Sequence, residues 1–276
     1  MGFKITLAGD QGSGKSTVSK ILIARTGAAY HSTGMVARAY AEKLGMDIAA
    51  FNVYSESRPE IDYEIDGALE ALGESPQDMI IDSRMAWHFV RGNFAVYLFS
   101  DPEVCAERIF AARRATETFP TKEEALRAIR RRKASETKRY RDLYRVVIGD
   151  FTNYHLLIDS TYAHPEEVAD YILEGLAAWQ ANPAYRGAYI SPLRLYYPDE
   201  EPAQDKLSRL TALIERGQTV PPVTVAMRED RYYILDGAES AVACALCGLS
   251  FVPFVLTTTG ELTEQNFVKM ENLYPC

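Results

Sequence analysis

The segment between residues 9 and 17 constrains the fold of this chain more tightly than any other stretch. It reads Gly-Asp-Gln-Gly-Ser-Gly-Lys-Ser-Thr and matches the G-x-x-x-x-G-K-S/T pattern of a phosphate-binding P-loop. The apolar run at 3–8 predicts a buried strand, and the helical spacing over 18–24 predicts a helix after the loop. A strand, a loop and a helix in this order point backbone N–H groups and a helix N-terminus at an anion. The segment therefore predicts an α/β fold that binds a nucleotide triphosphate.

Each residue type in the loop has its own task at a phosphate group. Glycines let the backbone wrap without a side chain in the way. Lys15 is expected to bridge the β- and γ-phosphates of ATP, and the Ser16 hydroxyl to contact Mg²⁺. The predicted ATP-binding residues are Gly9, Gly12, Ser13, Gly14, Lys15, Ser16 and Thr17. ATP as phosphoryl donor and Mg²⁺ are the expected cofactors.

The composition of the 276-residue chain suits one large domain or two modest ones, since 47% of its residues are hydrophobic. No apolar run reaches the length of a membrane-spanning helix, and the first residues lack the pattern of a signal peptide. We therefore expect a cytoplasmic protein without a membrane partner. The net charge of −8 argues against direct binding of nucleic acid.

Positive charge is nevertheless concentrated in one segment. Residues 105–145 contain thirteen Lys or Arg and six Asp or Glu. A basic segment inside an acidic chain favours residues that face an anionic ligand. The alternative is a solvated helix face, which is the usual role of a charge run.

The cysteine pattern predicts no metal site. Cys244 and Cys247 form a C-x-x-C pair, but neither a second pair nor a histidine cluster accompanies it, so zinc is not expected. The pair lies in an apolar helical stretch, which favours buried cysteines over a redox pair.

Short apolar runs alternate with helical stretches along the first part of the chain. Further strands are predicted at 28–31, 78–82, 94–99 and 154–159, and helices at 33–44, 61–72, 102–112, 122–144 and 165–179. Nearly continuous apolar runs are typical of strands covered on both faces. The pattern predicts a three-layer α/β fold with a five-stranded parallel sheet and with functional residues at the carboxyl ends of the strands.

Polar residues follow these strands where each of them ends. Ser32 follows the second strand, Asp82 and Arg84 the third, and Asp159 the last. Ser and Asp also cap helices, so each of them alone is weak evidence for a ligand site. Arg84 is different, because arginine does not cap a helix N-terminus.

A second pattern begins after a linker at 181–187. It has an apolar stretch at 188–195, a helix at 203–216, strands at 223–227 and 232–235, a helix at 238–247 and a strand at 252–256. The chain is therefore divided into a domain over 1–182 and a smaller α+β domain over 186–276.

Further motifs accompany the P-loop in the first domain. They include Ser32-Thr33-Gly34 with Arg38, Glu60-Ile61-Asp62, Ile80 to Trp87, Ala106 to Ile109, Ser135-Glu136, Arg139-Tyr140 and Pro165 to Ala169. With the P-loop, these motifs resemble the archaeal-type cytidylate kinases, a branch of the nucleoside monophosphate kinases. The resemblance implies a P-loop kinase fold and transfer of the ATP γ-phosphoryl group to a nucleoside monophosphate, with CMP or dCMP as the first candidate.

The resemblance also implies a mobile basic lid. Arginines suit this reaction, because phosphoryl transfer depends on positioning and charge neutralisation. Arg108, Arg113 and Arg114 lead into the expected lid. The expected catalytic residues are Lys15, Arg84, Arg113, Arg131 and Asp82; the acceptor-binding residues are Ser32, Gly34, Arg38, Arg84 and Arg139; the metal contacts are Ser16 and Asp82.

Two positions depart from the pattern of that family. The family commonly has Gly-Ile-Asp-x-x-Asp after the Arg-Tyr helix, but this chain has Val147 at the first aspartate. The family also usually has Glu-Gly-Arg after the third strand, where this chain has Asp82-Ser83-Arg84. Both positions lie near the expected acceptor site, so the acceptor is less well specified than ATP.

The second domain is weakly similar to the ParB/sulfiredoxin-like domain through Tyr233 to Gly237, Val220 to Pro222 and Cys247 to Leu249. That superfamily places His or Arg after its Asp-Gly, whereas this chain has Ala238-Glu239-Ser240. We therefore expect this domain to keep the fold of that superfamily without its nucleotide chemistry. It would then be a structural, regulatory or partner-docking domain.

The leading hypothesis is an ATP- and Mg²⁺-dependent kinase of nucleotide substrates. A kinase of the same fold with another small-molecule acceptor is a close variant. The competing hypothesis is an ATP-binding regulatory or sensor protein that signals through its second domain. A homo-oligomer or a protein partner bound through that domain is left open.

Overall fold

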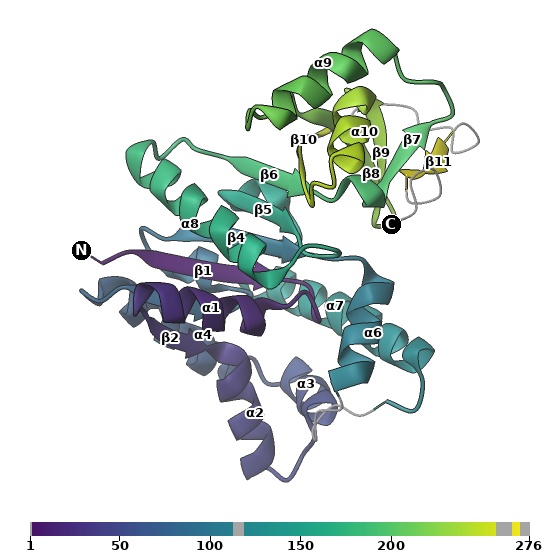
Figure 1. Cartoon of the computed structure of the whole chain (residues 1–276). Coiled ribbons are helices and arrows are strands. Elements are labelled where there is room, and N and C mark those ends of the chain that lie inside the picture. The colour runs from purple at the N-terminus through teal and green to yellow at the C-terminus, as the bar shows by residue number, and fades with distance from the viewer. Residues whose placement is uncertain (1, 113–118, 258–266, 271–276) are drawn as a thin grey trace. The chain divides into compact units, whose positions relative to one another are not determined.

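The computed structural model describes residues 2–112, 119–257 and 267–270, and Figure 1 shows the elements that they form. Two compact units divide the chain. Unit 1 comprises Met1–Leu157 and Pro165–Arg186, and unit 2 comprises Ile158–His164 and Gly187–Cys276. The second unit therefore includes a short segment from near the end of the expected first domain. Each unit is described below by itself.

A parallel sheet forms the centre of unit 1, as the alternating pattern predicted. Its strands are β1 (Lys4–Gly9), β2 (Ala29–Ser32), β3 (Met79–Asp82), β4 (Phe94–Phe99) and β5 (Leu156–Asp159), in the order β5-β4-β1-β3-β2; the last two residues of β5 belong to unit 2. β1 pairs in parallel with both β3 and β4, and β2 with β3. All residues of β1 and β4 are buried, which agrees with the continuous apolar sequence of β4 and the mainly apolar sequence of β1.

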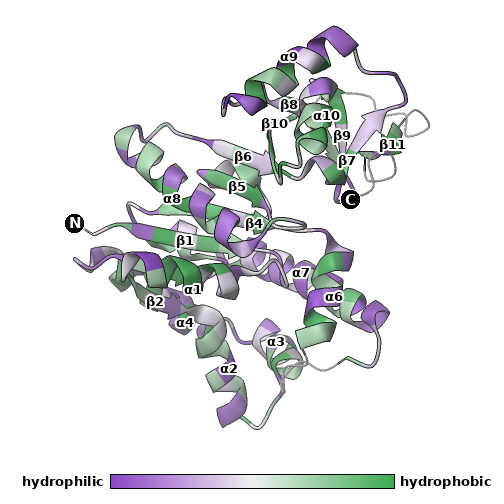
Figure 2. Cartoon of the chain, viewed as in Figure 1, coloured by the Kyte–Doolittle hydropathy of each residue, from purple (hydrophilic) through white to green (hydrophobic). Residues whose placement is uncertain are grey.

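Helices connect the strands of unit 1. They are α1 (Lys15–Thr26), α2 (Thr33–Lys43), α3 (Ile48–Glu56), α4 (Pro59–Glu74), α5 (Ala86–Phe89), α6 (Pro102–Ala112), α7 (Lys122–Tyr144) and α8 (Pro165–Ala181). α1 packs against α8 and β3, while α4 and α5 pack together. The hydropathy colouring of Figure 2 shows α7 as largely hydrophilic and the central strands as largely hydrophobic. α3 was absent from the sequence-based expectation.

One apolar cluster holds the helices beside β3. Leu69 of α4, Ile81 of β3 and Tyr140 of α7 belong to it, together with Met79, Met85, Ala86, Val90 and Ile148. Met79 and Ile81 join the same cluster because alternate residues of a strand point to the same face. This packing fixes the loop after β3 relative to α7.

Both tryptophans of the chain lie in unit 1. The Trp87 ring lies 5.7 Å from the Tyr154 ring, measured between centroids. The Trp179 ring lies 5.8 Å from that of Phe94 and 5.3 Å from that of His155. His155 Nδ1 accepts a hydrogen bond from the Ala95 N–H, and burial lowers the pKa of this histidine to about 4.

Unit 2 is an α+β arrangement. Its strands are β6 (Gly187–Ile190), β7 (Leu195–Pro198), β8 (Val223–Arg228), β9 (Arg231–Asp236), β10 (Val252–Thr257) and β11 (Phe267–Lys269), with helices α9 (Gln204–Glu215) and α10 (Ala238–Leu246). β8 pairs antiparallel with β9 and parallel with β10. The apolar stretch at 188–195 contains all of β6 except its first residue, and the first residue of β7.

A buried ion pair lies inside unit 2. Asp159 is completely buried, and its carboxylate accepts hydrogen bonds from the Thr161 N–H at 3.0 Å and the Ser191 N–H at 3.1 Å. Arg194 Nη1 lies 3.1 Å from Asp159 Oδ1, and only 4% of the arginine side chain is exposed. Asp159 thus joins the segment 158–164 to the chain that follows residue 187.

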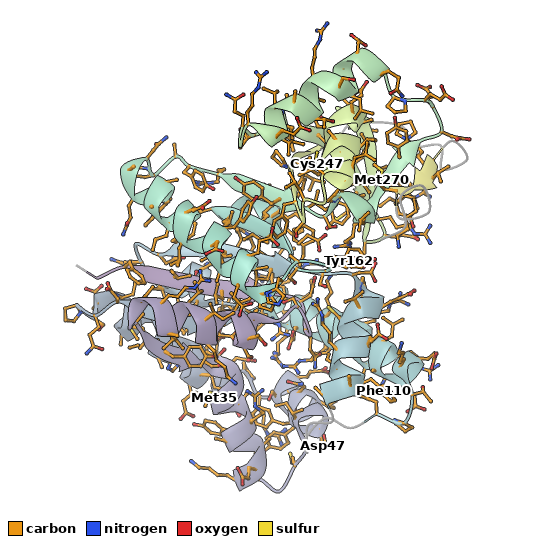
Figure 3. The ribbon with its side chains drawn as sticks, in the orientation of Figure 1. Met35, Asp47, Phe110, Tyr162, Cys247 and Met270 are labelled. Carbon is orange, nitrogen blue, oxygen red and sulfur yellow. The ribbon has the colours of Figure 1, made fainter. Side chains whose placement is uncertain are left out.

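Cys244 lies in α10, and Cys247 directly follows the last residue of that helix. Cys244 is buried, and burial raises the pKa of its thiol to about 12. Cys247, labelled in Figure 3, is partly exposed, and desolvation also raises the pKa of its thiol. Both are free cysteines. Raised pKa values keep thiols protonated at neutral pH, which disfavours thiolate chemistry.

The helices within the described ranges are too short or too polar for a bilayer. None of them combines the length and the apolar character that crossing a membrane requires.

Candidate active site

The P-loop joins the end of β1 to the start of α1. Gly14 precedes the helix with a φ of 85°, a left-handed conformation that glycine adopts without strain. A Cβ on Gly9 would lie 2.1 Å from the carbonyl oxygen of Leu98, so a side chain there would clash with β4. Ser13 is buried, and its hydroxyl donates to the Asp10 carbonyl at 2.8 Å. The loop is therefore held tightly against the sheet.

Lys15 turns back toward its own loop. Its Nζ donates to the carbonyl oxygens of Gly9 at 2.9 Å and Asp10 at 2.7 Å. Desolvation by burial lowers the pKa of Lys15, and the carboxylate of Asp82 opposes that shift. Ser16 is exposed in the first turn of α1. The loop thus brings one cation and the exposed hydroxyl residues Ser16 and Thr17 to the carboxyl edge of the sheet.

The loop after β3 presents a carboxylate and a guanidinium to the same edge. Asp82 ends β3 and accepts a hydrogen bond from the Tyr30 hydroxyl at 3.3 Å. The next residue, Ser83, is buried, and its hydroxyl accepts from the Met85 N–H at 3.2 Å. This turn fixes the backbone from which Arg84 projects.

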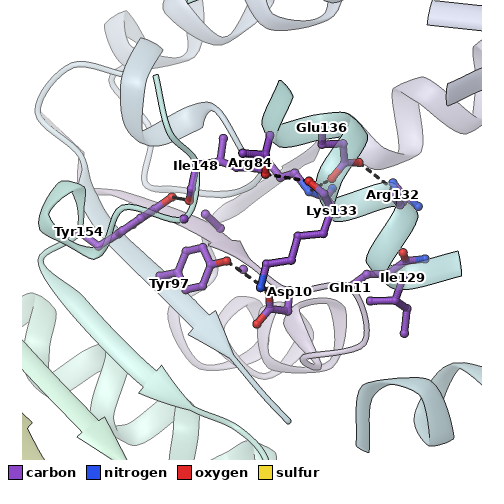
Figure 4. Close-up of a pocket in the computed structure, with 14 residues that line it drawn as sticks. Asp10, Gln11, Arg84, Tyr97, Ile129, Arg132, Lys133, Glu136, Ile148 and Tyr154 are labelled. Carbon is purple, nitrogen blue, oxygen red and sulfur yellow. Dashed lines mark hydrogen bonds and ion pairs between the residues drawn. The ribbon is translucent and has the colours of Figure 1, made fainter. Parts of the chain in front are cut away.

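One buried carboxylate binds two arginines from different elements. Glu136 of α7 lies 2.5 Å from Arg84 Nε through its Oε2, and 2.8 Å from Arg132 Nε through its Oε1. Figure 4 shows the carboxylate between the two guanidinium groups. Burial opposes ionisation of Glu136, but Arg84 and Arg132 hold its pKa below the usual value. Glu136 is therefore ionised at neutral pH.

α7 also contacts the P-loop. Lys133 Nζ lies 3.3 Å from Asp10 Oδ1, and Figure 4 shows its side chain extending toward that carboxylate. The same carboxylate accepts from the Tyr97 hydroxyl at 3.3 Å. Residues from the P-loop and from α7 line a small cavity, the P-loop cavity: Ala8, Gly9, Asp10, Gln11, Arg84, Tyr97, Ile129, Arg132, Lys133, Glu136, Thr137, Ile148, Gly149 and Tyr154.

A second cavity, the acceptor cavity, adjoins the first. It is lined by Thr33, Gly34, Ala37, Phe51, Asn52, Ser55, Ile61, Asp62, Ile65, Asp66, Arg84, Arg132, Glu136, Arg139 and Tyr140. Arg84, Arg132 and Glu136 line both cavities. The three residues therefore stand where the two cavities meet.

Two carboxylates of α4 lie in the acceptor cavity. Asp62 Oδ2 is 3.1 Å from Arg139 Nε, and both side chains are about 90% buried or more. Asp66, one turn later, accepts a hydrogen bond from the Tyr144 hydroxyl at 3.2 Å. Burial, reinforced by the charge of Asp62, raises the pKa of Asp66 to about 7. One carboxyl of the pair is thus partly protonated near neutral pH.

Comparison with known proteins shows the family to which unit 1 belongs. Residues 5–142 match the family described as AAA domain. Over 186 residues the chain is 34% identical to a cytidylate kinase of Thermoplasma volcanium, and the alignment covers 66% of this chain and 95% of that relative. The chain belongs to the cytidylate kinase family. As a member it is a P-loop phosphotransferase of the nucleotide kinase class, as the sequence predicted.

Other members and neighbours extend over the same fraction of the chain. A cytidylate kinase of Archaeoglobus fulgidus is 34% identical over 174 residues, which cover 63% of this chain and 94% of the relative. An S-adenosylmethionine-dependent nucleotide dehydratase of Lacinutrix mariniflava is 37% identical over 172 residues, but they cover only 35% of that protein. The shikimate kinase structure from Bacteroides thetaiotaomicron has a TM-score of 0.45 and 15% identity, covering 63% of this chain and 98% of that one.

The cytidylate kinase-like unit brings several predicted acceptor residues together. Gly34 and Arg139 line the acceptor cavity with Arg84. Arg38 is close to Gly34, because a Cβ on that glycine would lie 3.6 Å from Arg38 Nη1. The Ser32 hydroxyl accepts from the Met35 N–H at 3.4 Å, so it caps the N-terminus of α2.

Other predicted residues lie elsewhere. Arg131 is exposed, whereas its neighbour Arg132 lines both cavities. One residue along a helix changes the direction of a side chain by about 100°, which a count of charges does not resolve. Arg113 and Arg114 lie outside the described residues. Arg108 Nη1 approaches the Gly12 carbonyl at 3.5 Å.

Sequence reasoning gave no site role to four charged residues that line the acceptor cavity: Asp62, Asp66, Arg132 and Glu136. Arg132 and Glu136 are four residues apart, as are Asp62 and Asp66. That spacing places two side chains on one face of a helix. This four-residue spacing was the sequence signal from which both pairs could have been predicted.

Proposed function

We propose that this protein transfers the γ-phosphoryl group of ATP to CMP or dCMP. The observation that carries the proposal is the distribution of charge in the acceptor cavity. Arg84 and Arg132 stand where it meets the P-loop cavity, while Asp62 and Asp66 line it without lining the P-loop cavity. A nucleoside monophosphate fits this arrangement with its phosphate at the arginines and its base at the acids.

The acid pair supports cytosine as the base. A carboxylate accepts hydrogen bonds and attracts an exocyclic amino group, which cytosine carries and uracil lacks. Asp66, with a pKa raised to about 7 by burial, is partly protonated and can donate to a ring nitrogen. The carbonyl oxygen that uracil carries at the same position is itself a hydrogen-bond acceptor, so it does not pair with the accepting oxygens of Asp62, which Arg139 contacts at 3.1 Å. The names of the related cytidylate kinases support the same acceptor.

The phosphate side supplies positioning and charge. An oxygen of the acceptor phosphate attacks the γ-phosphorus, and the bond from that phosphorus to the bridging oxygen of the β-phosphate breaks. ADP and a nucleoside diphosphate are the products. In this proposal Lys15 contacts the ATP phosphates, and Arg84 and Arg132 neutralise the transferring group. Their planar guanidinium groups suit bidentate contact with phosphate oxygens.

The residues at the carboxyl edge fit a magnesium ion that arrives with ATP. Among the described residues, no group of three or more His, Cys, Asp or Glu is arranged to hold a metal. Ser16 provides an exposed hydroxyl at this edge and Asp82 a carboxylate, beside the P-loop carboxylate of Asp10. Mg²⁺ is commonly bound through one or two carboxylates together with substrate phosphates and water. When bound, it would neutralise charge on the ATP phosphates.

The test is an acceptor panel. Purified protein with ATP and Mg²⁺ is assayed against CMP, dCMP, UMP, AMP and GMP, and we expect the highest kcat/KM with CMP or dCMP. Lys15→Ala should abolish turnover, and Arg84→Ala should reduce the use of the acceptor. Tight ATP binding without turnover of any acceptor would refute the proposal. A preference for UMP would refute the assignment of the acids to the base.

For unit 2 we propose a structural or partner-docking role. Glu239 stands near the start of α10, where an anion site would need a cation, and Lys206 Nζ lies 2.8 Å from its Oε2. The neighbouring Ser240 is buried. An ion-paired carboxylate at this position disfavours the binding of a phosphate group. This supports a domain that keeps the fold without nucleotide chemistry.

A further inference from the structure

We propose that Glu136 is a positioning residue for phosphoryl transfer, an inference that rests on the proposed function. A carboxylate is an unexpected group in a site that handles phosphates, because it repels them. Yet Glu136 is 4% exposed and lines both the P-loop cavity and the acceptor cavity. A carboxylate at this place must have an effect that outweighs its repulsion of phosphate groups.

The contacts of Glu136 supply that benefit. Each carboxylate oxygen contacts the Nε of one arginine, Oε2 with Arg84 at 2.5 Å and Oε1 with Arg132 at 2.8 Å. Contact at Nε fixes the plane of a guanidinium group, while end-on bidentate contact with a phosphate uses the two Nη atoms. One carboxylate therefore sets the orientation of two phosphate-binding groups at once.

The two arginines come from different parts of unit 1. Arg84 follows β3 in the sheet, whereas Arg132 lies on α7 one turn before Glu136. Glu136 consequently sets the spacing between a guanidinium of the sheet edge and a guanidinium of α7. Transfer requires both groups to meet the same moving phosphoryl group, and misplacement by about 1 Å can reduce the rate by about 10²-fold.

Glu136 affects nucleotide binding through its charge and the chemical step through the orientation of the two arginines. Removing its charge changes affinity and kcat in opposite directions, which separates a positioning role from a purely structural one. Removing the negative charge of Glu136 makes the site more positive, so phosphate groups should bind equally well or more tightly. The same change releases the Nε atoms, so the arginines lose their orientation and the chemical step slows. A loss of kcat without a loss of affinity is the expected signature.

The experiment compares full-length Glu136→Gln with wild type and with Asp142→Asn. Asp142 lies on the same helix, is paired with Lys138 at 2.8 Å and lines neither cavity. We expect kcat with CMP to fall by about 10²-fold in Glu136→Gln. Dissociation constants for ATP and CMP, measured by calorimetry, should stay equal or decrease. Asp142→Asn should match wild type in both measurements.

A conservative variant guards against a folding defect. Glu136→Asp keeps the charge but shortens the side chain, so we expect a lower kcat without tighter nucleotide binding. Unchanged kcat in Glu136→Gln would overturn the inference, as would a parallel loss of kcat, affinity and melting temperature in both variants. Absence of wild-type turnover with every acceptor refutes the proposed function and this role together. Wild-type turnover with an unaffected Glu136→Gln refutes the positioning role alone.

Discussion

Replacing Arg194 by methionine is expected to destabilise unit 2 strongly. The change removes the cation from a completely buried carboxylate while keeping most of the side-chain volume. Asp159 would keep its hydrogen bonds from the Thr161 and Ser191 N–H groups. It would have lost the guanidinium that stabilises its negative charge.

The magnitude follows from the burial of both partners. Breaking a buried ion pair by removing one partner costs about 3–5 kcal/mol, because an uncompensated charge remains. The retained N–H donors still stabilise the carboxylate, so we expect the lower end, about 3 kcal/mol. For a domain of this class, 1 kcal/mol corresponds to a change in melting temperature of about 4–8 °C. A decrease of roughly 12–24 °C is therefore expected for the transition of unit 2.

Differential scanning calorimetry and urea unfolding followed by circular dichroism would measure the loss. Arg209→Met is the matched control, since the Arg209 side chain is 81% exposed and its pair with Asp205 spans 3.7 Å. It should leave the transition unchanged. The double variant Asp159→Leu/Arg194→Met should recover much of the stability, because it leaves no buried charge. A loss below about 1 kcal/mol in Arg194→Met would refute this reasoning.

Three further predictions concern the kinase unit. Arg132→Ala should lower kcat by about 10²-fold or more, whereas Arg131→Ala should have little effect; equal effects in steady-state assays would contradict the assignment of the cavity face. Lys15→Ala should lower kcat/KM for ATP by at least about 10²-fold, and a smaller loss would show that Lys15 does not contact the transferring phosphates. The raised pKa of Asp66, about 7 in the folded state, contributes stability that is complete below the unfolded pKa and is lost as pH rises to about 7. Asp66→Asn should flatten this part of the stability profile from urea unfolding, and an unchanged profile would exclude Asp66 as its source.

The sequence predicted the elements whose signals are local. The P-loop, the apolar strands of the parallel sheet and the long helix over 122–144 all depend on motifs or periodicity within a single segment. The motifs that indicated the family and the phosphotransferase class are likewise short, contiguous segments of sequence. The comparisons confirmed both. α3 has a start signal, since the Asp47 carboxylate accepts a hydrogen bond from the Ala50 N–H, but the nine residues Ile48–Glu56 are apolar at most positions, which leaves the helical periodicity weak.

The remainder of the site depends on contacts between distant segments. Glu136 contacts Arg84 across 52 positions of the chain, and its burial cannot be inferred from α7 alone. Asp159 was interpreted as a residue at a strand end, but its partner Arg194 lies in the other predicted domain. Charge patterns identify candidate residues, whereas the folded chain decides which of two adjacent arginines faces a cavity.

The position of the two tryptophans gives this protein a built-in optical reporter. Trp87 packs beside Tyr154, which lines the P-loop cavity, and Trp179 packs against Phe94 of the sheet. The chain has no other tryptophan. Emission excited at the red edge of tryptophan absorption therefore reports on unit 1, whatever happens in unit 2. Quenching on addition of ATP would come from Trp87, so a Trp87→Phe variant should become optically silent toward the nucleotide.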